Sequence, residues 1–83
     1  MHTSIFRDTH AEALFISDLQ PSQHPDRDTV RIAISGSLRT YGSRGCAALV
    51  AQEYGEHPET ATDRMAWARA AVAQTDDYEL AAA

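Results

Sequence analysis

The chain has 83 residues, with seven Arg, no Lys and twelve acidic residues, so its formal net charge is −5. This length suits one small domain and leaves no room for a barrel or a complete dinucleotide-binding fold. The acidic balance argues against a general nucleic-acid coat protein, because phosphate binding needs local positive charge. A single cysteine, Cys46, excludes an internal disulfide framework and multi-cysteine zinc sites.

The sequence carries no sign of membrane insertion or export. No stretch approaches the roughly 20 apolar residues of a membrane helix, and the first residues lack the basic region and apolar core of a secretory signal. We therefore expect a cytoplasmic protein.

The free energy gained by burying apolar surface, roughly 120 kcal/mol, only matches the entropic cost of ordering the chain, about 125 kcal/mol. Additional burial against a partner or a second copy is therefore expected.

Hydrophobic spacing predicts an all-α fold, a compact bundle of three to four short helices with the last two paired as a helical hairpin. Residues 8–75 are expected to form this single helical domain. Residues 1–7 are predicted to be a flexible N-terminus and residues 76–83 a flexible C-terminal tail.

The first helix is predicted over residues 8–20. Thr9 is its expected N-cap, and Glu12 follows at capping-box spacing. A short strand through residues 14–16 is the alternative at this position. Residues 20–28 contain two prolines, which cannot continue a helix, and are predicted to be a linker.

The second helix is predicted over residues 27–41. Asp28 or Asp26 would cap it, and Gly42 would end it. An alternating strand competes with this assignment, on Val30, Ile32 and Ile34. The helical template is preferred because it accounts for more of the segment.

The third helix is predicted over residues 44–54, with Ser43 as N-cap and Gly55 as the residue that stops it. Pro58 would open the last helix, since a missing N–H is harmless at the first position. This helix is expected to fade near residues 74–77. The predicted core contains six large side chains: Trp67, Tyr54, Tyr41, Leu38, Leu49 and Phe15.

Part of the chain resembles small uncharacterised proteins of actinomycetes. The resemblance is carried by GCAALVAQEYGEHPET at residues 45–60 and by RMAWAR at residues 64–69, and it covers roughly residues 15–73. It implies a complete small protein. It implies no activity, cofactor or binding residue.

A helix-turn-helix is one functional candidate. Ala51 and Gly55 lie four residues apart, like the small residue and turn glycine of that motif, and a helix follows. Glu59 and Asp63 weaken this interpretation because they would face phosphates. A plain helical hairpin is the alternative. The residues expected to contact DNA under this hypothesis are Arg39, Arg44, Thr60, Thr62, Arg64 and Arg69.

Charge is divided unevenly along the chain. Residues 27–44 contain four Arg and one acid, whereas residues 51–63 contain four acids and no base. Ile32 and Gly36 share a side of the second helix outside its main apolar arc, which indicates a further packing side. The expected protein contacts are Arg27, Arg31, Ile32, Gly36, Arg39 and Arg44.

The arginines also allow three roles that need no protein partner. The basic helix could meet the protein's own acidic turn, or the Arg stems could shield apolar surface. Phosphate binding at residues 42–45, where a helix starts, is also chemically reasonable, although the lysine and spacing of a P-loop are missing.

The sequence predicts no enzyme, metal or cofactor. Its four histidines have no paired ligand spacing; they are His2, His10, His24 and His57. Cys46 and His57 could be imagined as nucleophile and base. Cys46, however, falls on an apolar helix face, which favours inert packing in the core.

The C-terminal residues resemble the Leu-Ala-Ala ending of a bacterial degradation tag, and a frayed helix end is the alternative interpretation. The possible degradation signal comprises Leu80, Ala81, Ala82 and Ala83. The leading hypothesis is a small non-enzymatic regulatory or adaptor protein that binds a protein partner or a second copy of itself. A helix-turn-helix transcriptional regulator is the alternative. We expect no membrane partner.

Overall fold

The chain is helical through most of the part that the structure describes, which is residues 2–82 for the backbone and residues 8–75 for the side chains. In this computed structural model the elements are α1 (His2–Phe15), the 3-10 turn η1 (Pro21–Gln23), α2 (Arg27–Glu56) and α3 (Pro58–Ala82). Residues 2–82 contain no strand, so the predicted all-α fold is confirmed. The radius of gyration is 12.2 Å, close to the ~12 Å typical of a compact domain of this length.

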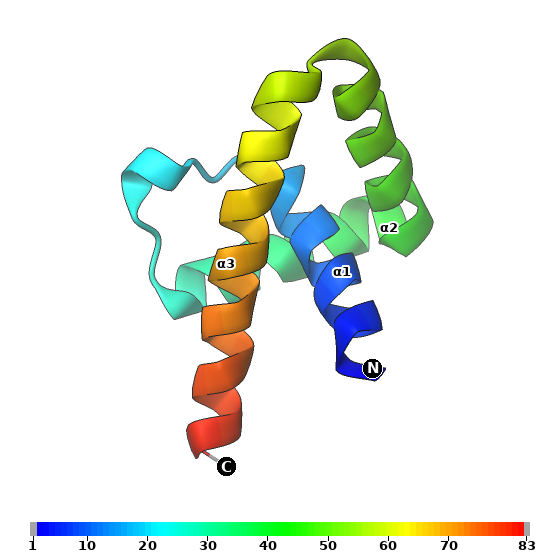
Figure 1. The fold of residues 1–83 in the computed structure, drawn as a ribbon. Coiled ribbons are helices and arrows are strands. Elements are labelled where there is room, and N and C mark those ends of the chain that lie inside the picture. The colour runs from blue at the N-terminus through cyan, green and yellow to red at the C-terminus, as the bar shows by residue number, and fades with distance from the viewer. Residues whose placement is uncertain (1, 83) are drawn as a thin grey trace.

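The three long helices all contact one another (Figure 1). α1 and α3 lie next to each other, and α1 begins on the side of the molecule where α3 ends. The first half of α2 crosses behind both helices, and its second half then turns away and leads back to the start of α3. His57 is the single residue between α2 and α3.

A sharp kink at Gly42 divides α2 into two halves. Gly42 has φ 70° and ψ 170°, a combination that essentially only glycine adopts. The prediction that Gly42 ends the second helix is therefore confirmed. Across the kink, the Cys46 thiol donates to the carbonyl oxygen of Ser37 at 3.8 Å. At the start of α2, Asp26 is the N-cap, and its Oδ1 accepts the Thr29 N–H at 2.8 Å.

Several predicted boundaries were wrong. α1 covers His2–Phe15 and not residues 8–20, so Thr9 lies inside the helix and does not cap it. The helix ends at Phe15, where Ser17 takes over local hydrogen bonding by donating from Oγ to the Leu14 carbonyl at 2.6 Å. Gly55 does not stop the second half of α2, which continues to Glu56.

The start of the last helix at Pro58 is confirmed, whereas its end is not. The α3 backbone continues to Ala82 and does not fade near residues 74–77. The expectation of flexible ends concerns residues 1–7 and 76–83, whose side chains lie outside the described part of the chain. The backbone of residues 2–7 belongs to α1 and that of residues 76–82 to α3.

The core contains many small side chains. Its buried members are Ala11, Ala13, Leu14, Phe15, Val30, Ile34, Cys46, Val50, Ala61, Met65, Ala68 and Val72. Phe15 is buried as predicted, and Leu38 and Trp67 pack against the core edge. The prediction was wrong for Tyr41 and Tyr54, which are 51% and 37% exposed. At the surface the tyrosine hydroxyl can meet water.

Candidate functional site

The first half of α2 has one buried side and one side that faces solvent. Val30, Ile34 and Ser37 point into the molecule at helical spacing. The opposite side, here called the outer face, comprises Asp28, Thr29, Ile32, Ser35, Gly36, Arg39 and Thr40. Ile32 is 70% exposed, the highest value among the exposed large apolar residues of the described chain. An aliphatic side chain is therefore presented to solvent on a well-formed helix.

Two depressions flank Ile32. The larger, here called the basic groove, has a volume of about 870 Å³ and is lined by His10, Asp28, Arg31, Ile32, Ile34, Ser35, Leu38, Arg39 and Thr75. The smaller, here called the hollow, has a volume of about 480 Å³. Its lining includes Ile16, Leu19, Ile32, Ala33 and Gly36. Ile32 lines both depressions and forms the ridge between them.

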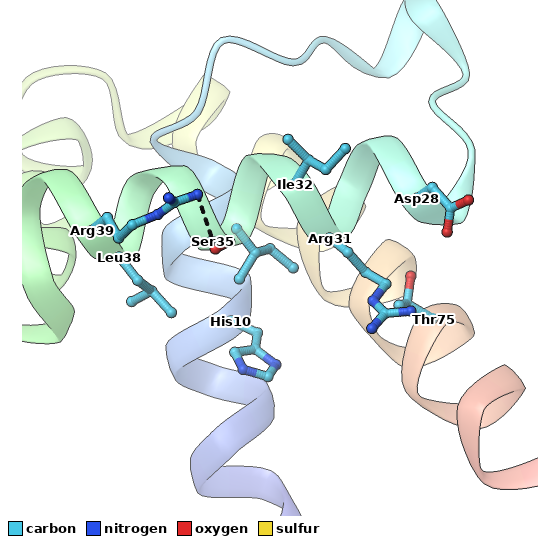
Figure 2. Close-up of a pocket in the computed structure, with 9 residues that line it drawn as sticks. His10, Asp28, Arg31, Ile32, Ser35, Leu38, Arg39 and Thr75 are labelled. Carbon is cyan, nitrogen blue, oxygen red and sulfur yellow. Dashed lines mark hydrogen bonds between the residues drawn. The ribbon is translucent and has the colours of Figure 1, made fainter. Parts of the chain in front are cut away.

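The basic groove combines aliphatic side chains with positive charge. Ile34 and Leu38 provide apolar surface, and Arg31 and Arg39 bring two guanidinium groups. Arg39 Nη2 donates to Ser35 Oγ at 3.5 Å (Figure 2). His10 enters from α1 and Thr75 from α3 (Figure 2). The groove thus draws on all three long helices.

The acidic residues gather at the connection between α2 and α3. They are Glu53, Glu56, Glu59 and Asp63, and all are exposed. This connection lies at one end of the molecule, at the top of Figure 1, whereas the first half of α2 crosses at mid-height. The division of charge along the sequence is therefore also a division in space. The acidic turn does not cover the first half of α2 (Figure 1).

Arg64 has a structural role that sequence reasoning missed. Its Nε donates to the carbonyl oxygen of Phe15 at 2.6 Å, and its Nη2 donates to those of Ser17 and Leu19, both at 2.9 Å. These acceptors lie at and just beyond the end of α1, where carbonyls lose their helical partners. Arg64 therefore caps α1 from α3, across 45 to 49 residues of sequence.

Two aromatic rings contact the same guanidinium. The Arg64 Cζ atom is 5.7 Å from the centroid of Phe15 and 5.1 Å from that of Trp67, distances typical of cation–π contacts. Burial lowers the pKa of Arg64 from its ordinary value, and the charge of Glu53 opposes this shift. Phe15 also stacks on Tyr54, with ring centroids 6.2 Å apart. Arg64 thus joins α1 and α3 at the edge of the core.

The six residues expected to contact DNA come from both halves of α2 and from α3. Arg64 is turned to α1, Thr60 Oγ1 donates to the His57 carbonyl at 3.2 Å, and Thr62 Oγ1 donates to the Pro58 carbonyl at 2.8 Å. Arg39, Arg44 and Arg69 are exposed, but they come from three different helical segments. Gly55 lies inside α2, so the predicted turn glycine is not in the turn.

The six residues expected to contact a protein are partly brought together. Arg31, Ile32 and Arg39 line the basic groove, and Gly36 lines the hollow. Arg27 lines a separate depression of about 210 Å³. Arg44 is exposed beyond the kink at Gly42. The possible degradation signal at residues 80–83 lies outside the described side chains.

The side chains considered above as metal ligands or nucleophiles lie at separate places in the described part of the chain. Among those residues, no group of three His, Cys, Asp or Glu is placed to hold a metal ion. Cys46 is buried in the core, and burial raises the pKa of its thiol. His57 is exposed at the α2–α3 connection and His24 in the linker, whereas the side chain of His2 is outside the described part.

No helix in the described residues has the length and apolarity required of a membrane span. Comparisons with protein families, curated proteins and solved structures give no match to this chain.

Proposed function

We propose that this chain is a small non-enzymatic regulatory or adaptor protein that acts by binding another protein chain through the outer face of α2. The observation that carries this proposal is the exposure of Ile32, at 70%, on a ridge between two depressions. Burying an isolated aliphatic side chain of this size contributes about 1.5–3 kcal/mol. A partner surface that covers Ile32 would gain that free energy.

The surroundings of Ile32 favour a protein helix as the bound element. Both depressions run beside a straight helical segment, and they offer aliphatic side chains with polar or charged groups around them. Amphipathic helices recognise such surfaces through apolar side chains at intervals of three and four residues. The guanidinium groups of Arg31 and Arg39 favour a helix that brings a carboxylate beside its apolar stripe.

Affinity capture with one charge substitution tests this proposal. Tagged wild-type chain is used as bait in extract of the native cell, beside Ile32→Asp and the control Ala48→Asp. Both substitutions add one carboxylate at an exposed position of α2. Ile32→Asp should lose the bound protein, whereas Ala48→Asp should retain it. Equal capture by both variants would refute the outer face as the docking surface.

Nuclease treatment of the same extract addresses the alternative function. A DNA-binding regulator would lose its captured material after nuclease treatment and as salt rises, because phosphate contacts release counterions. A protein partner held by Ile32 should survive nuclease treatment. Nuclease-sensitive capture that does not depend on Ile32 would favour DNA binding and would overturn the proposal.

A further inference from the structure

The outer face of α2 has the symmetry that a second copy of the same chain requires. This inference rests on the proposed function, because it names the partner of the same surface. We infer that two copies pack their α2 outer faces antiparallel across a two-fold axis that passes midway between Ile32 and Gly36. An interface of this kind is self-complementary, since every contact is made twice.

The outer face carries a protrusion and a recess side by side. Ile32 projects into solvent, whereas a Cβ built on Gly36 would meet nothing within 4 Å. The two residues are four apart, so they lie about 6 Å from each other along the helix and on nearly the same side. In an antiparallel pair, Ile32 of each copy lies over Gly36 of the other copy.

The hollow beside Gly36 can accept the incoming aliphatic side chain. It is lined on the inner side by Ile16, Leu19 and Ala33, and its volume is about 480 Å³. Ile16 and Leu19 come from the segment that follows α1, and they already pack against the core. Ile32 of the second copy would therefore meet these aliphatic side chains in a hollow that is formed before binding and that also has polar lining residues, among them Ser17, Asp18 and Thr40.

The two ends of the outer face carry opposite charges. Asp28 lies at one end and Arg39 at the other, with Ile32 between them (Figure 2). At 1.5 Å per residue, they are about 9 Å and about 8 Å from the midpoint between Ile32 and Gly36. The two-fold axis therefore brings Asp28 of each copy opposite Arg39 of the other. A parallel arrangement would instead place like charges together.

The size of the face sets the expected affinity. Residues 28–40 extend for about 20 Å along one helix, which makes the contact smaller than the roughly 800 Å² per partner of a standard interface. We therefore expect a dimer with a Kd in the micromolar range. Sedimentation from about 1 μM to about 1 mM brackets that affinity.

Charge reversal at Asp28 and Arg39 is the decisive experiment. Asp28→Arg and Arg39→Asp each turn both ion pairs of the dimer into like-charge contacts, and each should weaken Kd by about tenfold or more. The double variant Asp28→Arg/Arg39→Asp restores opposite charges and should restore the wild-type Kd. Within one chain the two residues are about 16 Å apart along the helix, about two Debye lengths at physiological salt. Recovery must therefore arise between copies.

The net charge of each variant distinguishes the proposed ion pairs from general repulsion between acidic chains. Asp28→Arg changes the net charge from −5 to −3, because one negative charge becomes positive. General repulsion between acidic chains would then favour association, whereas the proposed pairing predicts weaker association. The control Arg44→Asp reaches −7, the same value as Arg39→Asp, but lies outside the outer face. It should dimerise like the wild type.

Circular dichroism confirms that each variant is folded at the temperature of sedimentation. A wild-type chain that stays monomeric at about 1 mM would overturn the inference, as would a double variant that fails to recover. If that monomer still captured another protein through Ile32, the proposed function would stand and only the second copy would be wrong. Loss of both self-association and Ile32-dependent capture would refute both proposals.

Discussion

Replacing Arg64 removes the contacts that join the end of α1 to α3. Arg64→Met keeps most of the aliphatic stem but removes all three donors to the carbonyls of Phe15, Ser17 and Leu19. It also removes the charge that lies over two aromatic rings. We expect a large loss of stability with the same overall fold.

The magnitude follows from the contacts. A hydrogen bond to a charged group contributes about 1.5–3 kcal/mol. These three hydrogen bonds are only partly buried, so we take about 1 kcal/mol for each. A partly exposed cation–π contact adds about 0.5 kcal/mol or more. The expected loss is about 3–4 kcal/mol, a large part of the ~4–12 kcal/mol that a chain of 83 residues has.

Urea unfolding followed by circular dichroism measures this loss. Trp67 fluorescence gives a second signal, because Arg64 lies over its ring. Arg64→Lys should lose about 2 kcal/mol, since an ammonium group keeps the charge but cannot span the same carbonyls as a planar fork. Arg69→Met is the matched control on the exposed side of α3 and should change stability by about 0.5 kcal/mol or less.

A small effect would refute the reasoning. If Arg64→Met loses less than about 1 kcal/mol, and no more than Arg69→Met, the three hydrogen bonds do not stabilise the folded state. In thermal unfolding, the expected loss corresponds to a Tm lowered by about 12 °C or more. An unchanged Tm would likewise show that the Arg64 contacts do not stabilise the fold.

Three further predictions concern the backbone and two carboxylates. Gly42→Ala should destabilise the fold by about 1–3 kcal/mol, because a φ of 70° with a ψ of 170° suits only glycine. Gly55→Ala lies at a helical position with open space and should stabilise the fold by about 0.5–1 kcal/mol. Urea unfolding in which both variants change stability in the same direction would contradict this prediction. Burial, assisted by the charge of Asp8, raises the pKa of Glu12 above 4.5. The stability of the fold therefore falls as the pH rises from 4.5 through the raised pKa of Glu12. Glu12→Gln should therefore have a higher Tm than the wild type at pH 7 and no advantage below pH 4.5; an equal advantage at both would exclude the carboxylate as the cause. The hydrogen bond from Thr29 lowers the pKa of Asp26 below 3.8, so its contribution is complete above that pH and is lost as pH falls through the lowered pKa. Asp26→Ala should have a lower Tm than the wild type at pH 7, and a difference that persists in strong acid would count against capping.

Features decided within a few residues could be predicted from the sequence. Gly42 breaks α2 because a positive φ is open to glycine, and Pro58 begins α3 because its missing N–H is harmless there. Asp26 caps α2 through an N–H only three residues away. Each of these signals is local, and the sequence displays it directly.

Features decided by packing could not be predicted in the same way. Arg64 donates to backbone carbonyls that lie more than 40 residues earlier in the chain. Every residue has a backbone carbonyl, so the sequence does not indicate which of them Arg64 will contact. Tyr41 and Tyr54 lie on predicted apolar faces, but the core is filled largely by small side chains and both tyrosines remain exposed. The burial of a large side chain depends on the distance between helices, which hydrophobic spacing alone does not specify.

The candidate site shows the same limit. Ile32 and Gly36 could be identified because both fall outside the main apolar arc of one helix. His10 and Thr75 could not be assigned to the basic groove because they come from α1 and α3. Their position depends on how three helices cross, and this crossing arises from contacts distributed along the whole chain.

The cap on α1 sets the order in which parts of the fold can form during translation. Residues 15–19 leave the ribosome before Arg64 has been joined to the chain, and 49 residues separate Phe15 from its donor. At about 5–20 residues per second, that interval is roughly 2 to 10 s. During this time the carbonyls at the end of α1 lack the hydrogen bonds that Arg64 donates in the folded chain. The nascent chain can form α1 early, but Arg64 can hold the segment after it only once Arg64 itself has been added.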